Sequence, residues 1–197
     1  MIQHGIQLLN EVDYDGFSLR KIAAMCGVTH SAPYKHFKSK DDLIAAIVQE
    51  VSGSFKAALE EAEKRYPDDV ENQIIELGKC YVRFMVENPD YMRFIFVNPS
   101  QKRINMIHES DSNTDPYKIF KASALRYLEW LKANPQDQAV DILTMWSLVH
   151  GYSMLLVNGN IGVSDNYLEV IDKMLREKLC FNFQWETCPH PPSLRAK

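Results

Sequence analysis

Apolar residues recur every three or four positions along most of the chain, and no segment alternates apolar and polar residues as a half-buried strand would. The pattern therefore predicts an all-α protein. Turn-forming pairs such as Asn88-Pro89 and Asn134-Pro135 interrupt the periodicity and set the limits of the helices. About nine helices are expected, at about 2–12, 18–26, 29–37, 40–65, 69–87, 91–97, 116–133, 136–158 and 164–180.

The predicted helices group into two domains. The first three form an N-terminal helix-turn-helix DNA-binding domain over residues 1–47. A helical ligand-binding and dimerisation domain follows over 48–180, and the long helix from residue 40 joins the two. Residues 98–114 are expected to form a loop within the second domain, and 181–197, with three prolines, an extended tail.

The distribution of charge changes how the net charge of -4 is interpreted. Residues 16–40, the basic segment, contain no acid. Residues 41–197 hold 17 Lys and Arg against 23 Asp and Glu. The cations of the basic segment are Arg20, Lys21, Lys35, Lys38 and Lys40, with His30 and His36 beside them. A basic segment on an acidic body is typical of a protein that binds a polyanion.

The basic segment also has the pattern of a helix-turn-helix. Two short predicted helices are separated by Gly27-Val28-Thr29, where glycine permits a tight reversal. In such a motif the second helix enters the major groove, and nearby cations hold phosphates. The apolar residues expected to hold the angle between the helices are Leu19, Ile22, Ala23, Val28 and Phe37.

At these residues the chain resembles the TetR/AcrR family of repressors. The resemblance rests on residues 16–23, then Gly27-Val28-Thr29, then 33–43 (PYKHFKSKDDL). It implies an all-α, nine-helix dimer with an effector pocket in the C-terminal domain. Residues 146–151 (WSLVHG) resemble the Trp-His-Gly element of one C-terminal subgroup. Two features depart from the family pattern: Met1 falls within the first helix, where a basic arm often precedes it, and Pro33 replaces an aliphatic residue.

The resemblance assigns roles in DNA binding residue by residue. Tyr34, His36 and Lys40 match positions that reach phosphates. Lys35 is a candidate donor to guanine, and the Ala32 methyl a candidate contact for thymine. The full set expected at the DNA is Ser18, Thr29, His30, Ser31, Ala32, Tyr34, Lys35, His36 and Lys40.

The C-terminal domain is rich in aromatic and methionine side chains, which suit a small-molecule site but equally suit an ordinary core. Trp146 and His150 lie one helical turn apart and are the preferred lining pair, although His150 could instead be a satisfied core histidine. The cations of this region are expected on solvated faces, which favours a largely apolar, neutral or cationic ligand. The candidate lining residues are Phe84, Tyr91, Phe94, Tyr127, Trp146 and His150.

The last two helices are expected to form a four-helix dimer interface. Residues 139–157 are apolar nearly all round, so this helix must be covered on more than one side. The final helix carries one apolar stripe. The candidate interface residues are Leu143, Ser147, Leu168, Ile171 and Leu175.

The sequence thus predicts a cytoplasmic, homodimeric transcriptional regulator, a repressor released from an inverted-repeat operator by a small-molecule effector. No cofactor or metal is expected, and no membrane segment or signal peptide. Two alternatives stay open: a helical ligand-binding or interaction module without DNA binding, and a helical metalloenzyme. The second would use Cys180, Cys188 and His190, whose spacing fits no defined zinc pattern. The four scattered cysteines are expected to be reduced thiols.

Overall fold

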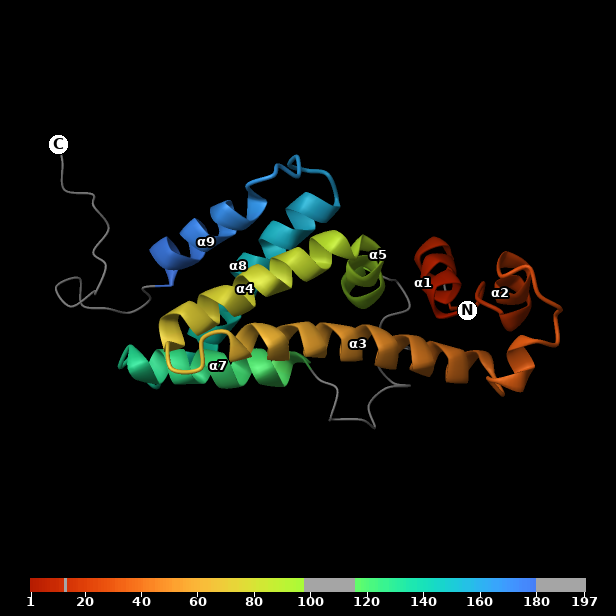
Figure 1. The fold of residues 1–197 in the computed structure, drawn as a ribbon, viewed down its shortest axis with the longest axis horizontal. Coiled ribbons are helices and arrows are strands. Elements are labelled where there is room, and N and C mark those ends of the chain that lie inside the picture. The colour runs from red at the N-terminus through yellow and green to blue at the C-terminus, as the bar shows by residue number, and fades with distance from the viewer. Residues whose placement is uncertain (13, 98–115, 180–197) are drawn as a thin grey trace. The chain divides into compact units, whose positions relative to one another are not determined.

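The computed structural model describes residues 1–12, 14–97 and 116–179. The predicted loop at 98–114 and tail at 181–197 therefore lie outside the described residues, as do Cys180, Cys188 and His190. Every regular element within the described ranges is a helix, which confirms the all-α prediction (Figure 1). The elements are α1 (Ile2–Glu11), α2 (Leu19–Met25), the 3₁₀ turn η1 (Pro33–Lys35), α3 (Lys40–Lys64), α4 (Val70–Glu87), α5 (Pro89–Met92), the π-helical turn η2 (Arg93–Val97), α7 (Pro116–Trp130), α8 (Gln138–Val157) and α9 (Tyr167–Lys178).

The chain divides into two compact units. Unit 1 comprises Met1–Ala57 and Glu87–Pro116, and unit 2 comprises Ala58–Val86 and Tyr117–Lys197. This division differs from the expected boundary after residue 47. α3 continues without a break through that position, and a later segment of the chain joins the N-terminal helices.

Unit 1 is built around α1, α2 and the first half of α3. Ile6, Ile22 and Ile47 are completely buried in its core. Gly5 lets α1 approach α3 closely, because a Cβ atom there would lie 2.5 Å from the Ile47 Cδ1 atom. The N-terminal helices therefore rest on their own small apolar core.

α5 and η2 pack on α1, and this contact explains why residues after Glu87 belong to unit 1. The Gln3 side-chain amide donates to the Tyr91 hydroxyl at 2.9 Å. The Asn10 amide donates to the Asp90 carbonyl oxygen at 3.0 Å. Sequence spacing does not reveal such contacts, because their partners lie 80 or more residues apart.

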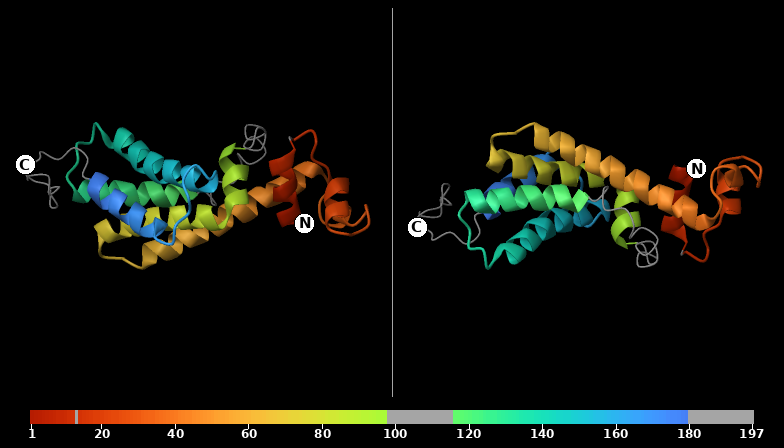
Figure 2. Two further views of the ribbon diagram at one scale, coloured as in Figure 1. Left: turned by 90° about the horizontal axis from the view of Figure 1, so that it is seen from above. Right: turned by 90° about the horizontal axis from the view of Figure 1, so that it is seen from below.

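Unit 2 consists of the end of α3 with α4, α7, α8 and α9, whose helices lie side by side in the views of Figure 2. α4 meets α8 and α9 at Gly78, where a Cβ atom would lie 2.6 Å from Leu175 Cδ1 and 3.3 Å from Val149 Cγ1. On another side, the Arg126 guanidinium on α7 pairs with Glu63 on α3 and donates to Gln73 Oε1 on α4 at 2.8 Å. Apolar packing and polar contacts thus both fix α4.

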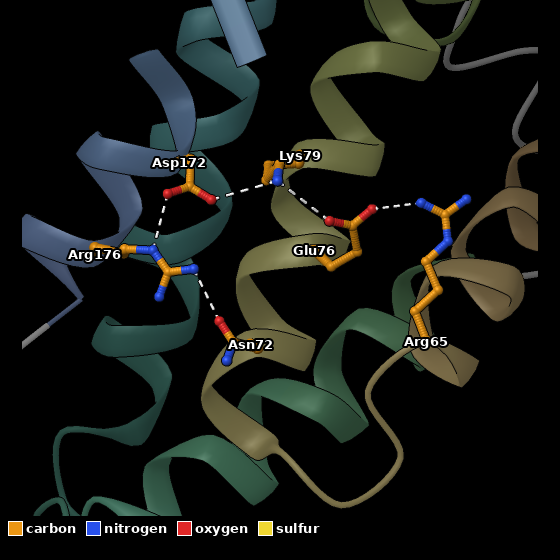
Figure 3. Close-up of polar contacts among 6 residues, drawn as sticks. All are labelled: Arg65, Asn72, Glu76, Lys79, Asp172 and Arg176. Atoms are coloured by element: carbon orange, nitrogen blue, oxygen red, sulfur yellow. Dashed lines mark hydrogen bonds and ion pairs between the residues drawn. The ribbon is translucent and has the colours of Figure 1, made fainter. Parts of the chain in front are cut away.

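A chain of ion pairs joins the end of α3 to α4 and α9 (Figure 3). The Glu76 carboxylate binds Arg65 at 2.8 Å and Lys79 at 3.4 Å. Lys79 also reaches Asp172 at 3.4 Å, and Arg176 binds the same carboxylate at 2.9 Å. The expectation that the cations of this region lie on solvated faces is thus wrong for Lys79, which is three-quarters buried between two carboxylates.

Candidate functional site

The turn between α2 and the segment that follows has the geometry expected from its glycine. Gly27 has a φ of +66°, a conformation that residues with a Cβ atom rarely adopt. Its N–H donates to the Ala24 carbonyl at 3.1 Å, and the Val28 N–H donates to the Ala23 carbonyl at 3.0 Å. These two bonds satisfy carbonyls at the end of α2 and reverse the chain.

Ser18 begins α2 as predicted, because its Oγ atom accepts a hydrogen bond from the Lys21 N–H at 3.3 Å. Leu19, Ile22 and Ala23 are buried and hold α2 against the core, which confirms their assignment. Val28 is 41% exposed, so the prediction that it holds the helix angle is wrong. Phe37, predicted as core, is half-buried.

Residues 29–37 form successive tight turns instead of the continuous short helix that was expected. The Ala32 N–H bonds to Thr29, the Lys35 N–H to Ala32, and the His36 N–H to Pro33, each spanning three residues. Pro33 has no N–H and so cannot donate to Thr29 as an α-helical residue would, and the regular element in this segment is the 3₁₀ turn η1. One bond spans four residues, from the Phe37 N–H to the Pro33 carbonyl at 2.9 Å.

A reciprocal cap begins α3. The Ser39 Oγ atom accepts from the Asp42 N–H at 3.1 Å, and the Asp42 carboxylate accepts from the Ser39 N–H at 3.2 Å. The same carboxylate also accepts from the Lys38 N–H at 2.9 Å. This capping box fixes the chain between η1 and α3, and thus the orientation of the residues before it.

The structure brings the predicted DNA-binding residues together on the segment from the Gly27 turn to the start of α3, with Ser18 at the head of α2. Ser18, Ala32 and Lys40 are partly buried, and Tyr34 is 59% exposed. The other exposed members of the set are Thr29, His30, Ser31, Lys35 and His36. Exposed polar and basic side chains on a short, capped segment can donate to phosphates and base edges.

Two lysines of the basic segment contact the loop between α1 and α2. The Lys40 ammonium lies 3.8 Å from the centroid of the Tyr14 ring and 3.1 Å from the Tyr14 carbonyl oxygen. The Lys21 ammonium donates to the Gly16 carbonyl oxygen at 2.8 Å. Lys40 therefore has a defined position at the beginning of α3.

In unit 2, an aromatic cluster surrounds the predicted pair Trp146 and His150. Their ring centroids lie 6.3 Å apart, and the Tyr117 ring lies 5.4 Å from that of Trp146. The Tyr81 hydroxyl lies 2.9 Å from His150 Nδ1. Sequence reasoning missed Tyr81, because a tyrosine at helical spacing 69 residues from its partner is indistinguishable from an ordinary core residue.

Burial sets the ionisation of the two polar members of this cluster. Burial raises the pKa of Tyr81 far above its ordinary value of 10.0, and a hydrogen bond from the Trp146 side chain offsets part of that rise. Burial lowers the pKa of His150 below its ordinary value of 6.5. Both groups are therefore neutral at neutral pH.

The other expected lining residues do not form one group. Tyr91 and Phe94 belong to unit 1, where they are buried, so the structure assigns them to its core beside α1. Tyr127 is buried in unit 2 with its ring stacked on Trp130 at 5.8 Å. Phe84 is half-buried on α4.

The expected dimer residues divide between surface and core. Leu143 is 59% exposed and Ser147 is also exposed, while Leu168 is partly buried. Ile171 and Leu175 are buried within one chain, so their assignment to a surface is corrected. The stripe of α9 that contains them faces α4, as the contact between Leu175 and Gly78 shows.

α8 is the one described helix that is long and apolar enough to cross a membrane by length and composition, a test that core helices of soluble proteins also pass. Its exposed apolar residues lie in one stripe, where Val140, Leu143 and Leu155 are between 44 and 64% exposed. Length and apolar composition alone therefore do not distinguish a membrane-spanning helix from a helix whose exposed face is covered by another protein chain.

A capped helix-turn-helix with exposed basic side chains, attached to a separate helical unit, defines a DNA-binding transcriptional regulator. Residues 2–47 match the model of bacterial regulatory proteins of the tetR family, and residues 74–177 match that of the tetracyclin repressor-like C-terminal domain. The chain belongs to the TetR family. Members of this family are DNA-binding regulators and not enzymes. The family therefore confirms the predicted transcriptional regulator and removes the metalloenzyme alternative.

Two solved structures share the fold. A protein of unknown function from a Rhodococcus species has a TM-score of 0.64 at 19% identity, over 88% of this chain and 90% of that one. The TetR family transcriptional regulator PfmR from Thermus thermophilus has a TM-score of 0.63 at 16% identity, over 88% of this chain and 93% of that one. No curated protein sequence matches the chain.

Proposed function

We propose that this regulator is a cytoplasmic homodimeric repressor that binds an inverted-repeat operator and leaves it when a small molecule binds unit 2. The observation that carries the DNA-binding part is the exposure of Thr29, Ser31 and Lys35 on a segment fixed by the Gly27 turn and the cap at Ser39. A segment whose backbone is already fixed loses less conformational entropy when it binds.

The roles of the exposed residues follow from their chemistry. Lys35 is a donor suited to guanine O6 and N7, and Ser31 can donate to or accept from a base edge. Tyr34, His36 and Lys40 supply donors to phosphate oxygens, which hold the protein on any sequence. The proposal therefore separates residues that choose the sequence from residues that give affinity.

Selection of bound fragments from genomic DNA, followed by binding measurements on the selected sequence, tests this assignment. Lys35→Ala and Ser31→Ala should change the preferred bases. Tyr34→Phe should weaken binding to all duplexes alike. Lys121→Ala, an exposed cation of α7 in unit 2, is the control and should leave binding unchanged.

Absence of any duplex binding by the full-length protein at low salt would instead support the alternative of a ligand-binding module without DNA binding. An unchanged base preference in both groove variants would refute the groove assignment alone.

The dimer part of the proposal rests on the exposed stripe of α8. An exposed apolar stripe suits a second copy, since a two-fold interface places the same residues from both copies against each other. Leu143 and Ser147 on α8, and the partly buried Leu168 on α9, keep their proposed roles in this interface. Two-fold symmetry in turn implies an operator with two related half-sites.

The effector part rests on the cluster of Tyr81, Trp146 and His150. Neutral polar groups among aromatic rings favour a largely apolar, neutral or cationic small molecule over an anion. Lys79 and Arg126 are paired with carboxylates, which also disfavours an anionic ligand. Repression relieved by such a molecule requires that it bind the DNA-free form more tightly than the bound form.

Thermal-shift screening of small molecules against the wild type and Trp146→Ala tests the effector site. A true effector should raise the melting temperature of the wild type and release it from the operator. The same molecule should do neither to Trp146→Ala, whose operator affinity and dimer should be intact. Trp130→Ala, at an exposed tryptophan of α7, is the matched control and should respond normally.

A further inference from the structure

The start of α3 uses its own residues to satisfy its backbone, and this determines how it can hold a phosphate. The Asp42 N–H is bonded to Ser39 Oγ, and the Asp42 carboxylate lies over the N–H groups of Lys38 and Ser39. A phosphate that approaches the N-terminus of α3 therefore finds these N–H groups already bonded and a negatively charged carboxylate beside them. Attraction must come from a side-chain cation, and Lys40 is the first residue of the helix.

Lys40 is held by one residue, Tyr14. The ammonium lies over the Tyr14 ring at 3.8 Å from its centroid and donates to the Tyr14 carbonyl at 3.1 Å. The ring is buried, and its hydroxyl donates to the carboxylate of Asp41, the residue after Lys40. The Tyr14 ring under the ammonium is thus held in place by its burial and by the hydrogen bond of its hydroxyl to Asp41.

An ammonium has three N–H donors, so one bond to a carbonyl leaves donor capacity for a phosphate oxygen. A free lysine side chain loses considerable rotamer freedom when it binds a fixed partner, and a side chain that is already ordered loses less. The aromatic ring adds a cation–π attraction that is compatible with a phosphate on the other side.

We propose that Tyr14 is a positioning residue for DNA binding, which orders the Lys40 ammonium over its ring and carbonyl so that it meets the operator backbone. The inference rests on the proposed function, because it needs Lys40 to contact a phosphate. Tyr14 itself lies outside the set of residues expected to touch DNA.

The test is a double-mutant cycle on a random-sequence duplex of about 30 base pairs at low salt, because phosphate contacts do not depend on sequence. Tyr14→Leu removes the ring but keeps the carbonyl, and should weaken binding about three- to tenfold in the wild-type background. In the Lys40→Ala background the same change should have no further effect. Tyr14→Phe keeps the ring and should bind within about twofold of the wild type.

A second measurement needs no substitution. In the free wild-type protein, the NMR signals of the Lys40 ε-methylene protons should be shifted upfield by the Tyr14 ring, and the shift should persist when the duplex binds. Loss of that shift on DNA binding would overturn the inference.

The two proposals fail in different ways. Equal weakening by Tyr14→Leu in both backgrounds would show a general structural role and overturn the positioning role alone. Absence of duplex binding by the wild type would overturn the proposed function and this inference together. Circular dichroism confirms that each variant is folded before its binding is interpreted.

Discussion

The exposed stripe of α8 gives a prediction whose size can be worked from the structure. Leu143 is 59% exposed, with Val140 one turn before it and Ser147 one turn after it on the same face. We expect Leu143→Glu to convert the dimer into monomers. At 59% exposure, Leu143 presents roughly 100 Å² of surface, and its burial contributes about 2.5 kcal/mol.

A two-fold interface uses the residue twice, so the substitution should remove about 5 kcal/mol from the free energy of dimerisation. That loss weakens the dissociation constant roughly a thousandfold or more, before the cost of placing two carboxylates near each other. Sedimentation velocity at micromolar concentration should show a dimer for the wild type and a monomer for Leu143→Glu. Far-UV circular dichroism should show the same helix content for both.

Leu175→Ala is the matched control, because Leu175 is also an apolar residue of the last two helices but is buried against α4 within one chain. It should lower the free energy of unfolding by about 2–5 kcal/mol through the cavity that it leaves. A Leu143→Glu protein that sediments as a dimer with the wild-type affinity would refute the assignment of this face. A wild-type protein that is monomeric at micromolar concentration would refute the dimer.

Three smaller predictions concern local structure. Gly27→Ala should destabilise the protein by about 1 kcal/mol because of the positive φ of Gly27. Gly53→Ala should stabilise the protein by roughly 0.5–1 kcal/mol, because Gly53 lies within α3 and a Cβ atom there would meet no other atom. Denaturant unfolding measures both changes. Ser39→Ala should cost about 1 kcal/mol by removing the cap, and equal stability in this variant would contradict the capping role. Because burial lowers the pKa of His150 in the folded state, its contribution to stability is complete above pH 6.5 and is lost as the pH falls below that value. The melting temperature of His150→Gln should therefore fall less on acidification than that of the wild type.

The sequence predicted those features of the fold that depend on local chemistry. Ser18, Gly27 and Ser39 act through hydrogen bonds or backbone angles within a few residues, so their roles could be derived from spacing alone. The sequence pattern predicts a helix at 29–37, where the structure has tight turns around Pro33, which lacks an N–H. In a segment this short, the loss of that single donor favours 3₁₀ turns over a regular α-helix.

Long-range partners could not be predicted in the same way. An apolar stripe shows that a helix face is covered but not by what, and α9 packs its stripe inside one chain while α8 leaves one exposed. Tyr91 was placed with the effector residues on composition, yet its hydroxyl bonds to Gln3 in unit 1. In both cases the covering element is distant in sequence.

The connection between the two units constrains how an effector can act on DNA binding. α3 passes from unit 1 into unit 2 between Ala57 and Ala58 as one uninterrupted helix, with Lys40 at its first residue. At its other end, Glu63 is paired with Arg126 on α7, and Arg65 just after the helix is paired with Glu76 on α4. Tyr81, which contacts His150, lies on that same α4. A molecule that moves α4 should therefore either carry the end of α3 with it or break the Arg65–Glu76 ion pair, so substitution of Glu76 should separate effector binding from release of the operator.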